Sequence, residues 1–245
     1  MYPIYLVTVI VGTRPEAIKL APLIKTFKKS KKVKTRVVLT GQHIDMVEQV
    51  MEIFDIKYDL NLKLMKHNQT LTYITKNVIN ALEKDFQQYE PKLVVVQGDT
   101  TSAFAAALAS FYQKVPVAHV EAGLRTGNIY SPWPEEANRK LTSHITKYHF
   151  APTASSKENL KKEGIFSKNI AITGNTVIDS LFWVIKKLKK NKTIISELEK
   201  KFYFLKKNKK LILVTGHRRE SFGEGFNEIC VALGKLAHKY PEVQI

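Results

Sequence analysis

The sequence of 245 residues contains one cysteine, Cys230, so no disulfide can form within the chain. This fits a reducing compartment, and we expect a cytoplasmic protein. No run approaches the about 18 apolar residues of a transmembrane helix. The apolar start, residues 1–16, lacks the basic region and the small-residue cleavage site of a signal peptide. We therefore expect no membrane insertion, and we interpret residues 6–11 as a first buried strand.

Acidic residues are few beside the basic ones, with 22 Asp and Glu against 39 Lys and Arg and a formal net charge of +17. Such a charge can indicate a nucleic-acid or acidic-membrane surface. The lysines, however, form separate clusters without the interleaved aromatic residues of RNA-binding modules. We interpret them as solvated helix faces and expect no nucleic-acid partner, although a positive field would help to capture an anionic nucleotide.

Short β-branched apolar runs alternate with longer amphipathic stretches along most of the chain. This alternation predicts an α/β fold, with a parallel sheet covered by helices on both faces. The expected strands are residues 6–11, 37–39, 93–96, 115–120, 148–151, 170–172 and 211–214. The expected helices are residues 16–29, 46–54, 71–89, 101–113, 135–145, 155–163, 177–190 and 226–240.

A polar turn at residues 173–176 ends this alternation and predicts a domain boundary near Gly174. We expect residues 1–174 to form an N-terminal Rossmann-like domain. Residues 175–245 would contain linker helices and the first part of a second domain. Because a lone strand–helix–strand start cannot close a domain, we expect the second domain to be incomplete in this chain.

Four polar clusters directly follow predicted strands. They are residues 12–16, residues 98–101, residues 119–123 with their continuation to Arg125 and residues 134–136, and residues 215–220. Ligands of open α/β sheets bind outside the carboxyl ends of the strands, so we expect these clusters to converge around a ligand. No spacing resembles a zinc site or a Ser–His–Asp arrangement, and we expect no bound metal.

The first and fourth clusters carry cations that suit an anionic ligand. Arg14 can clamp a phosphate bidentately, although a solvated arginine at a plain turn is the alternative. His217 is suited to act as an acid or phosphate donor, and Arg218 and Arg219 are suited to contact anions. The alternative for His217 is a structural histidine.

The second and third clusters supply carboxylates. Asp99 lies at the mouth of the sheet, where an N-cap of the next helix is the alternative. Glu121 ends a buried strand, which is costly unless it pairs with Arg125 or Arg139 or works in acid–base chemistry. Glu135 follows Pro134, and the alternative to a catalytic role is a first-turn glutamate that the helix dipole favours. Together these three carboxylates are what proton abstraction from an unactivated carbon needs.

Eight segments in order closely resemble the non-hydrolysing UDP-N-acetylglucosamine 2-epimerase family: GTRPEAIKLAPLI, TGQH, QGDTTS, HVEAGLRTG, SPWPEEANR, FAPT, TGNTVID and TGHRRE. The resemblance implies two Rossmann-like domains of GT-B type with the substrate in the cleft between them. It also implies reversible conversion of UDP-N-acetylglucosamine to UDP-N-acetylmannosamine, by anti elimination of UDP and re-addition to a glycal intermediate. No NAD or metal cofactor is implied. A homodimer that supplies precursors of surface polysaccharide is the expected context.

By motif match, the resemblance makes Asp99, Glu121 and Glu135 the essential carboxylates and leaves open which of them is the base. His217 matches the histidine that assists the UDP leaving group, and Arg14 matches an arginine near the substrate. We also expect substrate contacts from Lys19, Arg139 and Arg218.

The family continues beyond the last residue of this chain with an Asp-Ser-Gly-Gly segment and further UDP contacts, so the activity of the chain as it stands is left open. Two alternatives also remain. One is the hydrolysing relative, which releases free N-acetylmannosamine, and the other is a non-catalytic UDP-sugar-binding remnant. A basic nucleic-acid module is a more distant third.

Overall fold

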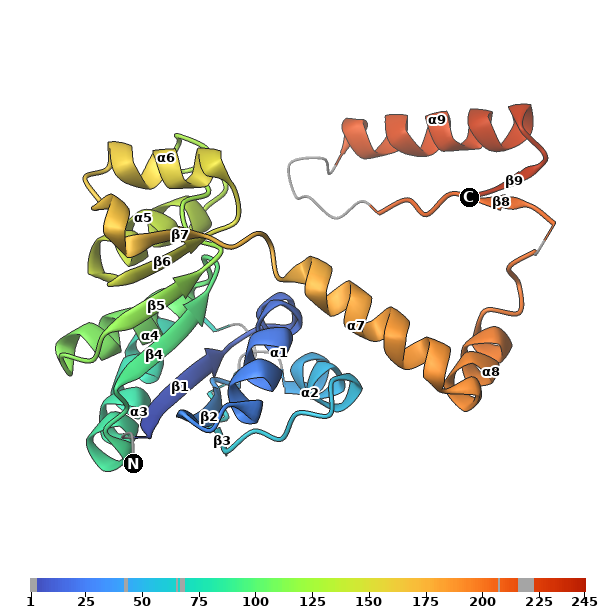
Figure 1. Ribbon diagram of the computed structural model, residues 1–245. Helices are drawn as coiled ribbons and strands as arrows, with labels where there is room; N and C mark the ends of the chain where they lie inside the picture. The colour runs from blue at the N-terminus through green and yellow to red at the C-terminus, as the bar shows by residue number, and fades with distance from the viewer. Residues whose placement is uncertain (1–3, 42–43, 65, 67–68, 207, 216–222) are drawn as a thin grey trace. The chain divides into compact units, whose positions relative to one another are not determined.

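The apolar runs of the sequence form a seven-stranded parallel sheet in the computed structural model (Figure 1). The structure describes residues 4–41, 44–64, 66, 69–206, 208–215 and 223–245. The strands of the sheet are β1 (Tyr5–Val11), β2 (Val33–Leu39), β3 (Leu60–Asn61), β4 (Leu93–Gln97), β5 (Val117–Val120), β6 (Tyr148–Ala151) and β7 (Ile170–Ile172). Their order is β3-β2-β1-β4-β5-β6-β7, so the direction of strand succession reverses between β1 and β4. Open α/β sheets bind ligands at such a reversal, beyond the carboxyl ends of the strands.

The chain divides into two compact units, Met1–Lys186 and Lys187–Ile245. The helices that begin in the first unit are α1 (Arg14–Lys29), α2 (Ile44–Ile53), α3 (Leu71–Tyr89), α4 (Thr101–Tyr112), α5 (Glu135–Ile145), α6 (Ala154–Lys162), a 3-10 turn (Ser167–Asn169) and α7 (Val177–Lys190). The second unit contains α8 (Lys192–Lys201), β8 (Lys210–Leu211), α9 (Glu224–Lys239) and β9 (Val243–Gln244), and its two short strands pair in parallel. The boundary near Gly174 stays a prediction.

Two apolar layers cover the sheet of the first unit. Alternate side chains of β1, among them Val9 and Val11, pack with α1 and α2 on one face. Ile10 points to the other face and joins Val94 and Val96 of β4 against α3 and α4. Because the central strands β1, β4 and β5 are buried on both faces, they are apolar along most of their length. This arrangement confirms the predicted α/β class and the parallel sheet.

Helix α7 is attached to the first unit through its first half. The Trp183 ring stacks on Phe54 with centroids 4.7 Å apart. The Ser180 hydroxyl donates a hydrogen bond to the carbonyl of Ile18 in α1. Trp183 also packs against the apolar layer that contains α1 and α2. The start of α7 is therefore held against α1 and α2.

Most predicted elements are present, and the differences have local causes. The predicted ranges 71–89, 135–145 and 177–190 coincide with α3, α5 and α7. The predicted strand 211–214 is wrong in extent, because β8 covers only Lys210–Leu211, the two residues that β9 is long enough to pair. Strand β3 was not expected, since its two residues, Leu60–Asn61, carry no alternating pattern.

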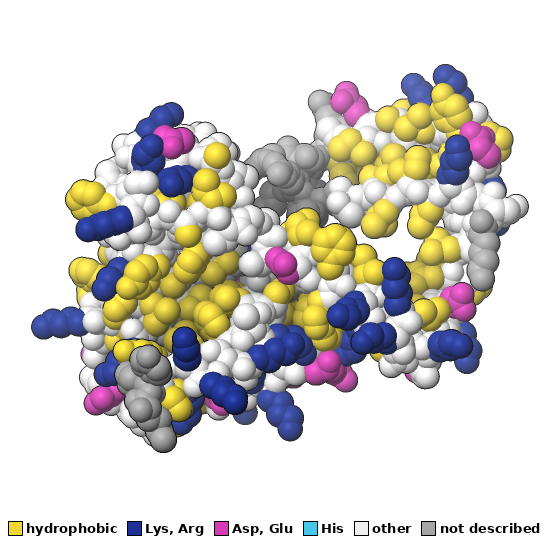
Figure 2. Space-filling view, viewed as in Figure 1, with side chains coloured by type: hydrophobic (Ala, Val, Ile, Leu, Met, Phe, Trp, Pro, Cys, Tyr) yellow, Lys and Arg dark blue, Asp and Glu magenta, His cyan; other side chains and the backbone are white. Residues whose placement is uncertain are grey.

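Basic side chains are spread over the visible face of each unit, interspersed with acidic and neutral ones (Figure 2). On this face the distribution is that of solvated helix surfaces. Among the helices of the described residues, none combines the length and the apolar character that crossing a bilayer requires.

Candidate active site

The carboxyl ends of β1, β4 and β5 carry the polar residues of three predicted clusters. Gly12 and Thr13 connect β1 to α1, and Gly98, Asp99 and Thr100 connect β4 to α4. Strand β1 pairs with β4, and β4 pairs with β5, so the three clusters lie along neighbouring strands at the reversal of strand order.

Glu121, the residue after β5, adopts a left-handed backbone conformation with φ of +64°. This conformation costs a residue with a Cβ roughly 1 kcal/mol, and such residues concentrate at functional sites. Gly98 nearby has a similar φ of +73°. Because glycine has no Cβ, it adopts this conformation without that cost. The backbone of Glu121 therefore points to a functional role for its side chain.

Three donors surround the Glu121 carboxylate, whose side chain is 11% exposed. Its Oε2 accepts hydrogen bonds from Lys19 Nζ, at 2.6 Å, and from Gln97 Nε2. Its Oε1 accepts from Asn175 Nδ2 at 3.0 Å. Three donors, one of them positively charged, therefore hold the carboxylate in place.

Of the two reasons considered for Glu121, a structural pair with Arg125 or Arg139 is wrong, because other carboxylates pair with both arginines. Arg125 forms a fork with Glu163, with N–O distances of 2.6 and 2.8 Å, and this contact lowers the pKa of the Glu163 carboxyl. Arg139 pairs with Asp99 and, at 3.4 Å, with Glu136. Sequence reasoning also missed the neutral donors to Glu121, since Gln97 and Asn175 are unremarkable polar residues beside the predicted turns.

Asp99 contacts side chains of α5 and does not cap α4. Its carboxylate pairs with Arg139, and its backbone carbonyl accepts a hydrogen bond from Asn138 Nδ2 at 2.9 Å. The alternative that Asp99 caps α4 is wrong, because the cap is Thr100, whose hydroxyl accepts from the Ala103 N–H at 3.0 Å.

Burial raises the pKa of the Asp99 carboxyl, and the Arg139 guanidinium opposes that shift. The charges of Glu135 and Glu121 raise the Asp99 pKa further. The three predicted carboxylates therefore form one electrostatic group. Their environments differ, which is the pattern of sites that divide acid and base roles.

Glu135 is the first residue of α5 and has the least engaged carboxylate of the three. Its Oε2 is buried and has no hydrogen-bond partner among the described residues. A buried carboxylate oxygen without a partner is costly, which points to a ligand or proton that it meets in function.

The other predicted cations differ in their surroundings. Arg14 is exposed and forms no ion pair or side-chain hydrogen bond with the part of the chain that the structure describes. Lys19 and Arg139 contact Glu121 and Asp99 and keep 23% and 16% of their side chains exposed. Three further predicted residues lie outside the described residues: His217, Arg218 and Arg219.

Sequence reasoning missed Glu16, a carboxylate that lies between the loops after β1 and β4. It accepts hydrogen bonds from the Gly12 N–H at 2.6 Å and from the hydroxyls of Thr13 and Thr100 at 3.1 and 2.7 Å. The pattern T-x-x-E at residues 13–16 was the available signal, since the glutamate of a capping box reaches back to groups before its helix. The Gly12 N–H therefore already donates to Glu16.

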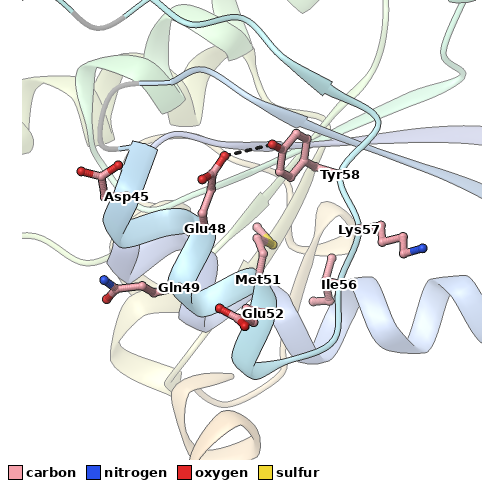
Figure 3. A pocket seen from close by; sticks show the side chains of 8 residues that line it. All are labelled: Asp45, Glu48, Gln49, Met51, Glu52, Ile56, Lys57 and Tyr58. Atoms are coloured by element: carbon pink, nitrogen blue, oxygen red, sulfur yellow. Dashed lines mark hydrogen bonds between the residues drawn. The ribbon is translucent and has the colours of Figure 1, made fainter.

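An open hollow of about 670 Å³ lies along α2 and the segment that follows it (Figure 3). It is lined by Asp45, Glu48, Gln49, Met51, Glu52, Ile56, Lys57 and Tyr58. The Tyr58 hydroxyl donates to Glu48 at 2.9 Å, and this hydrogen bond raises the tyrosine pKa. With three carboxylates and one lysine, the hollow repels anions and does not suit a nucleotide. Within the described residues, no group of three His, Cys, Asp or Glu side chains is placed to hold a metal ion.

Residues 25–245 match the family described as UDP-N-acetylglucosamine 2-epimerase. The chain belongs to this family. A UDP-N-acetylglucosamine 2-epimerase of Yersinia pestis is 49% identical over 239 residues, which cover 98% of this chain and 64% of the relative. The enzyme of that name from Neisseria meningitidis serogroup A is 51% identical over 235 residues, 96% of this chain and 63% of the relative.

Solved structures of family members have the same fold. The Neisseria meningitidis UDP-GlcNAc 2-epimerase bound to UDP-GlcNAc has a TM-score of 0.92 and 50% identity, over 98% of this chain and 64% of that one. The Methanocaldococcus jannaschii UDP-GlcNAc 2-epimerase, in complex with UDP-GlcNAc and UDP, has a TM-score of 0.82 and 32% identity, over 96% and 64%. These likenesses confirm the expected α/β fold of GT-B type. The chain spans 64% of the length of the first relatives of the UDP-N-acetylglucosamine 2-epimerase family that it matches.

Proposed function

We propose that this protein interconverts UDP-N-acetylglucosamine and UDP-N-acetylmannosamine by epimerisation at C2. The observation that carries the proposal is the group of three carboxylates, Asp99, Glu121 and Glu135, at the reversal of strand order. Family membership supports the same activity. A relative that is 50% identical has been solved with UDP-GlcNAc bound, which supports the substrate.

The C2 proton of the sugar is barely acidic, so UDP must leave as the proton is removed. The C2–H electron pair becomes the C1–C2 double bond of a glycal, while the C1–O bond breaks and its electron pair stays on UDP. Return of UDP to C1 and of a proton to the opposite face of C2 gives the epimer. The reaction therefore needs a base on one face of C2 and an acid on the other.

The surroundings of the three carboxylates support different roles. Glu135, whose Oε2 has no hydrogen-bond partner among the described residues, is our candidate for the group that takes the C2 proton. Asp99, whose pKa is raised by burial, is our candidate for the group that returns a proton on the other face. Glu121 is held by three donors, and we propose that it orients the sugar rather than transferring a proton.

The cations are assigned by charge and exposure. We propose that Arg14, His217 and Arg218 contact the diphosphate, where neutralising charge on the leaving group lowers the barrier. Lys19 and Arg139 would hold Glu121 and Asp99 and reach the substrate through their exposed parts. In keeping with the family resemblance, we further propose a cytoplasmic homodimer that supplies surface-polysaccharide precursors.

The test is turnover of UDP-N-acetylglucosamine in D2O by the protein expressed from the whole of its gene. We expect both UDP-sugars to form and to carry deuterium at C2, as measured by proton NMR and mass spectrometry. A mixture without deuterium at C2 would contradict the mechanism. Free N-acetylmannosamine and UDP as main products would favour the hydrolysing alternative, and binding without turnover would favour the UDP-sugar-binding remnant.

A further inference from the structure

The Glu16 carboxylate is buried without a cation. Its residue is 2% exposed, and its three hydrogen-bond donors, which belong to Gly12, Thr13 and Thr100, are all neutral. No ion pair reaches it from the described residues. Burial of a carboxylate with only neutral partners is costly, and desolvation accordingly raises the Glu16 pKa while the hydrogen bonds oppose the shift. A glutamate at such a position calls for a role beyond local helix capping.

The contacts of Glu16 join two loops that carry proposed site residues. The Gly12 N–H belongs to the loop that leads to Arg14, and the Thr100 hydroxyl follows Asp99 directly. Thr100 accepts from the Ala103 N–H at 3.0 Å, so its hydroxyl proton is free to donate to Glu16 at 2.7 Å. Glu16 thus ties the start of α1 to the start of α4.

The loop after β1 approaches the first turn of α4 so closely that there is no room for a side chain at Gly12. A Cβ added to Gly12 would lie 2.9 Å from Ser102 Cβ and 3.2 Å from Glu16 Oε2. Lys19 follows Glu16 by three residues, and so lies on the same side of α1, where it contacts Glu121. One helix therefore fixes the ends of β1, β4 and β5 relative to each other.

We propose that Glu16 is a positioning residue for the reaction, which acts by holding Asp99 and Arg14 at a fixed separation through Thr100 and Gly12. This inference rests on the proposed epimerase function. Misplacement of a reacting group by about 1 Å can lower a rate by about 100-fold. Loss of the Glu16 contacts should therefore affect turnover more than substrate affinity.

The test compares variants of the protein expressed from the whole of its gene, with kcat and KM measured by deuterium incorporation at C2. Glu16→Gln keeps the size of the side chain but places an amide donor among three donors. We expect kcat to fall at least about tenfold, with KM changed less than about threefold. Thr100→Val should have the same effect. Thr100→Ser keeps the hydroxyl and should therefore keep kcat near the wild-type value. In the double variant Glu16→Gln with Thr100→Val, kcat should be no lower than in the worse single variant, because the two changes remove one link.

Thr153→Val is the control for the loss of a helix cap alone. The Thr153 hydroxyl caps α6 by accepting from the Ser156 N–H at 3.1 Å, as Thr100 caps α4, but Glu16 does not contact it. Thr153→Val should lower the thermal midpoint and leave kcat unchanged. Wild-type kcat in Glu16→Gln, or an equal loss of kcat in Thr153→Val and Thr100→Val, would overturn the inference alone. A wild-type protein that incorporates no deuterium at C2 would overturn the proposed function and this inference with it.

Discussion

Lys19 Nζ lies 2.6 Å from Glu121 Oε2, which joins α1 to the residue that follows β5 across 102 positions of sequence. Gln97 and Asn175 complete the surroundings of the same carboxylate. The site is therefore organised around contacts between side chains from four separate segments.

Replacing Lys19 with methionine should weaken both stability and turnover. The change removes the only cation on Glu121 among the described residues and leaves it two neutral donors. We expect the free energy of unfolding to fall by about 2 kcal/mol, as for a partly buried charged hydrogen bond. Urea unfolding measures this loss, and kcat should fall in the deuterium assay.

Lys28→Met is the matched control for Lys19→Met. Lys28 lies on the same helix and donates only an exposed hydrogen bond, to the carbonyl of Lys57 at 2.7 Å. Its loss should change the free energy of unfolding by less than about 0.5 kcal/mol. If both substitutions lowered the free energy of unfolding equally, the contact of Lys19 with Glu121 would not contribute to stability.

Glu135→Gln should nearly abolish exchange of the C2 proton if Glu135 is the base. Loss of a general base typically lowers a rate by about 100- to 10,000-fold, while substrate binding persists. We expect a fall of kcat in that range with the KM for UDP-N-acetylglucosamine little changed. Glu52→Gln, at an exposed carboxylate of α2, is the control and should keep wild-type kcat. Retained exchange in Glu135→Gln would instead favour Asp99 or Glu121 as the base.

Gly123→Ala should destabilise the first unit strongly. Gly123 has φ of +88°, and an added Cβ would lie 2.2 Å from the backbone oxygen of Ser156, which cannot yield without moving α6. We expect a loss of about 3 kcal/mol or more from the clash and the backbone strain together. The measurement is the shift of the urea midpoint.

Gly164→Ala separates strain from clash. Gly164 has a similar φ of +85°, but no atom lies within 4 Å of an added Cβ. Only the conformational cost of about 1 kcal/mol should remain. If the two alanine variants lost equal stability, the close approach of α6 to Gly123 would not matter.

Acid should destabilise the protein in part through His119. Burial lowers the pKa of this histidine from 6.5 to about 4, and its Nε2–H donates to the Gly98 carbonyl at 2.7 Å. Between pH 6.5 and 4 the unfolded chain binds a proton at this residue that the folded chain does not. The free energy of unfolding therefore falls as the pH falls through this window, by about 3 kcal/mol at most for one such group.

The variant His119→Gln removes this titration and should show a shallower loss of stability between pH 6.5 and 4. His149, whose pKa burial also lowers to about 4, would account for a remaining slope. His144→Gln is the control, since His144 is exposed, and it should keep the wild-type slope. Unfolding by urea at several pH values measures the slopes, and identical slopes in all three proteins would refute the role of His119.

Much of the fold was predictable because it depends on local pattern. Strands such as Leu93–Gln97 are continuous apolar runs, and helices such as Leu71–Tyr89 carry an apolar stripe. The order of these elements is enough to indicate a parallel α/β sheet with its polar clusters at the carboxyl edge. Strand β3 was not predicted, because two residues are too few to show a period.

The sequence by itself determined the family, the α/β class and the candidate carboxylates, since these are properties of local runs and of their order. Only the tertiary structure decided the partners: Glu121 meets Lys19, Arg125 meets Glu163, and Glu16 meets Thr100. The chain holds 39 Lys and Arg for 22 Asp and Glu. A pattern along one dimension does not say which cation lies nearest to a given carboxylate. That choice is made where strand ends from distant parts of the chain are packed side by side, because ion pairs and hydrogen bonds act only over a few ångströms.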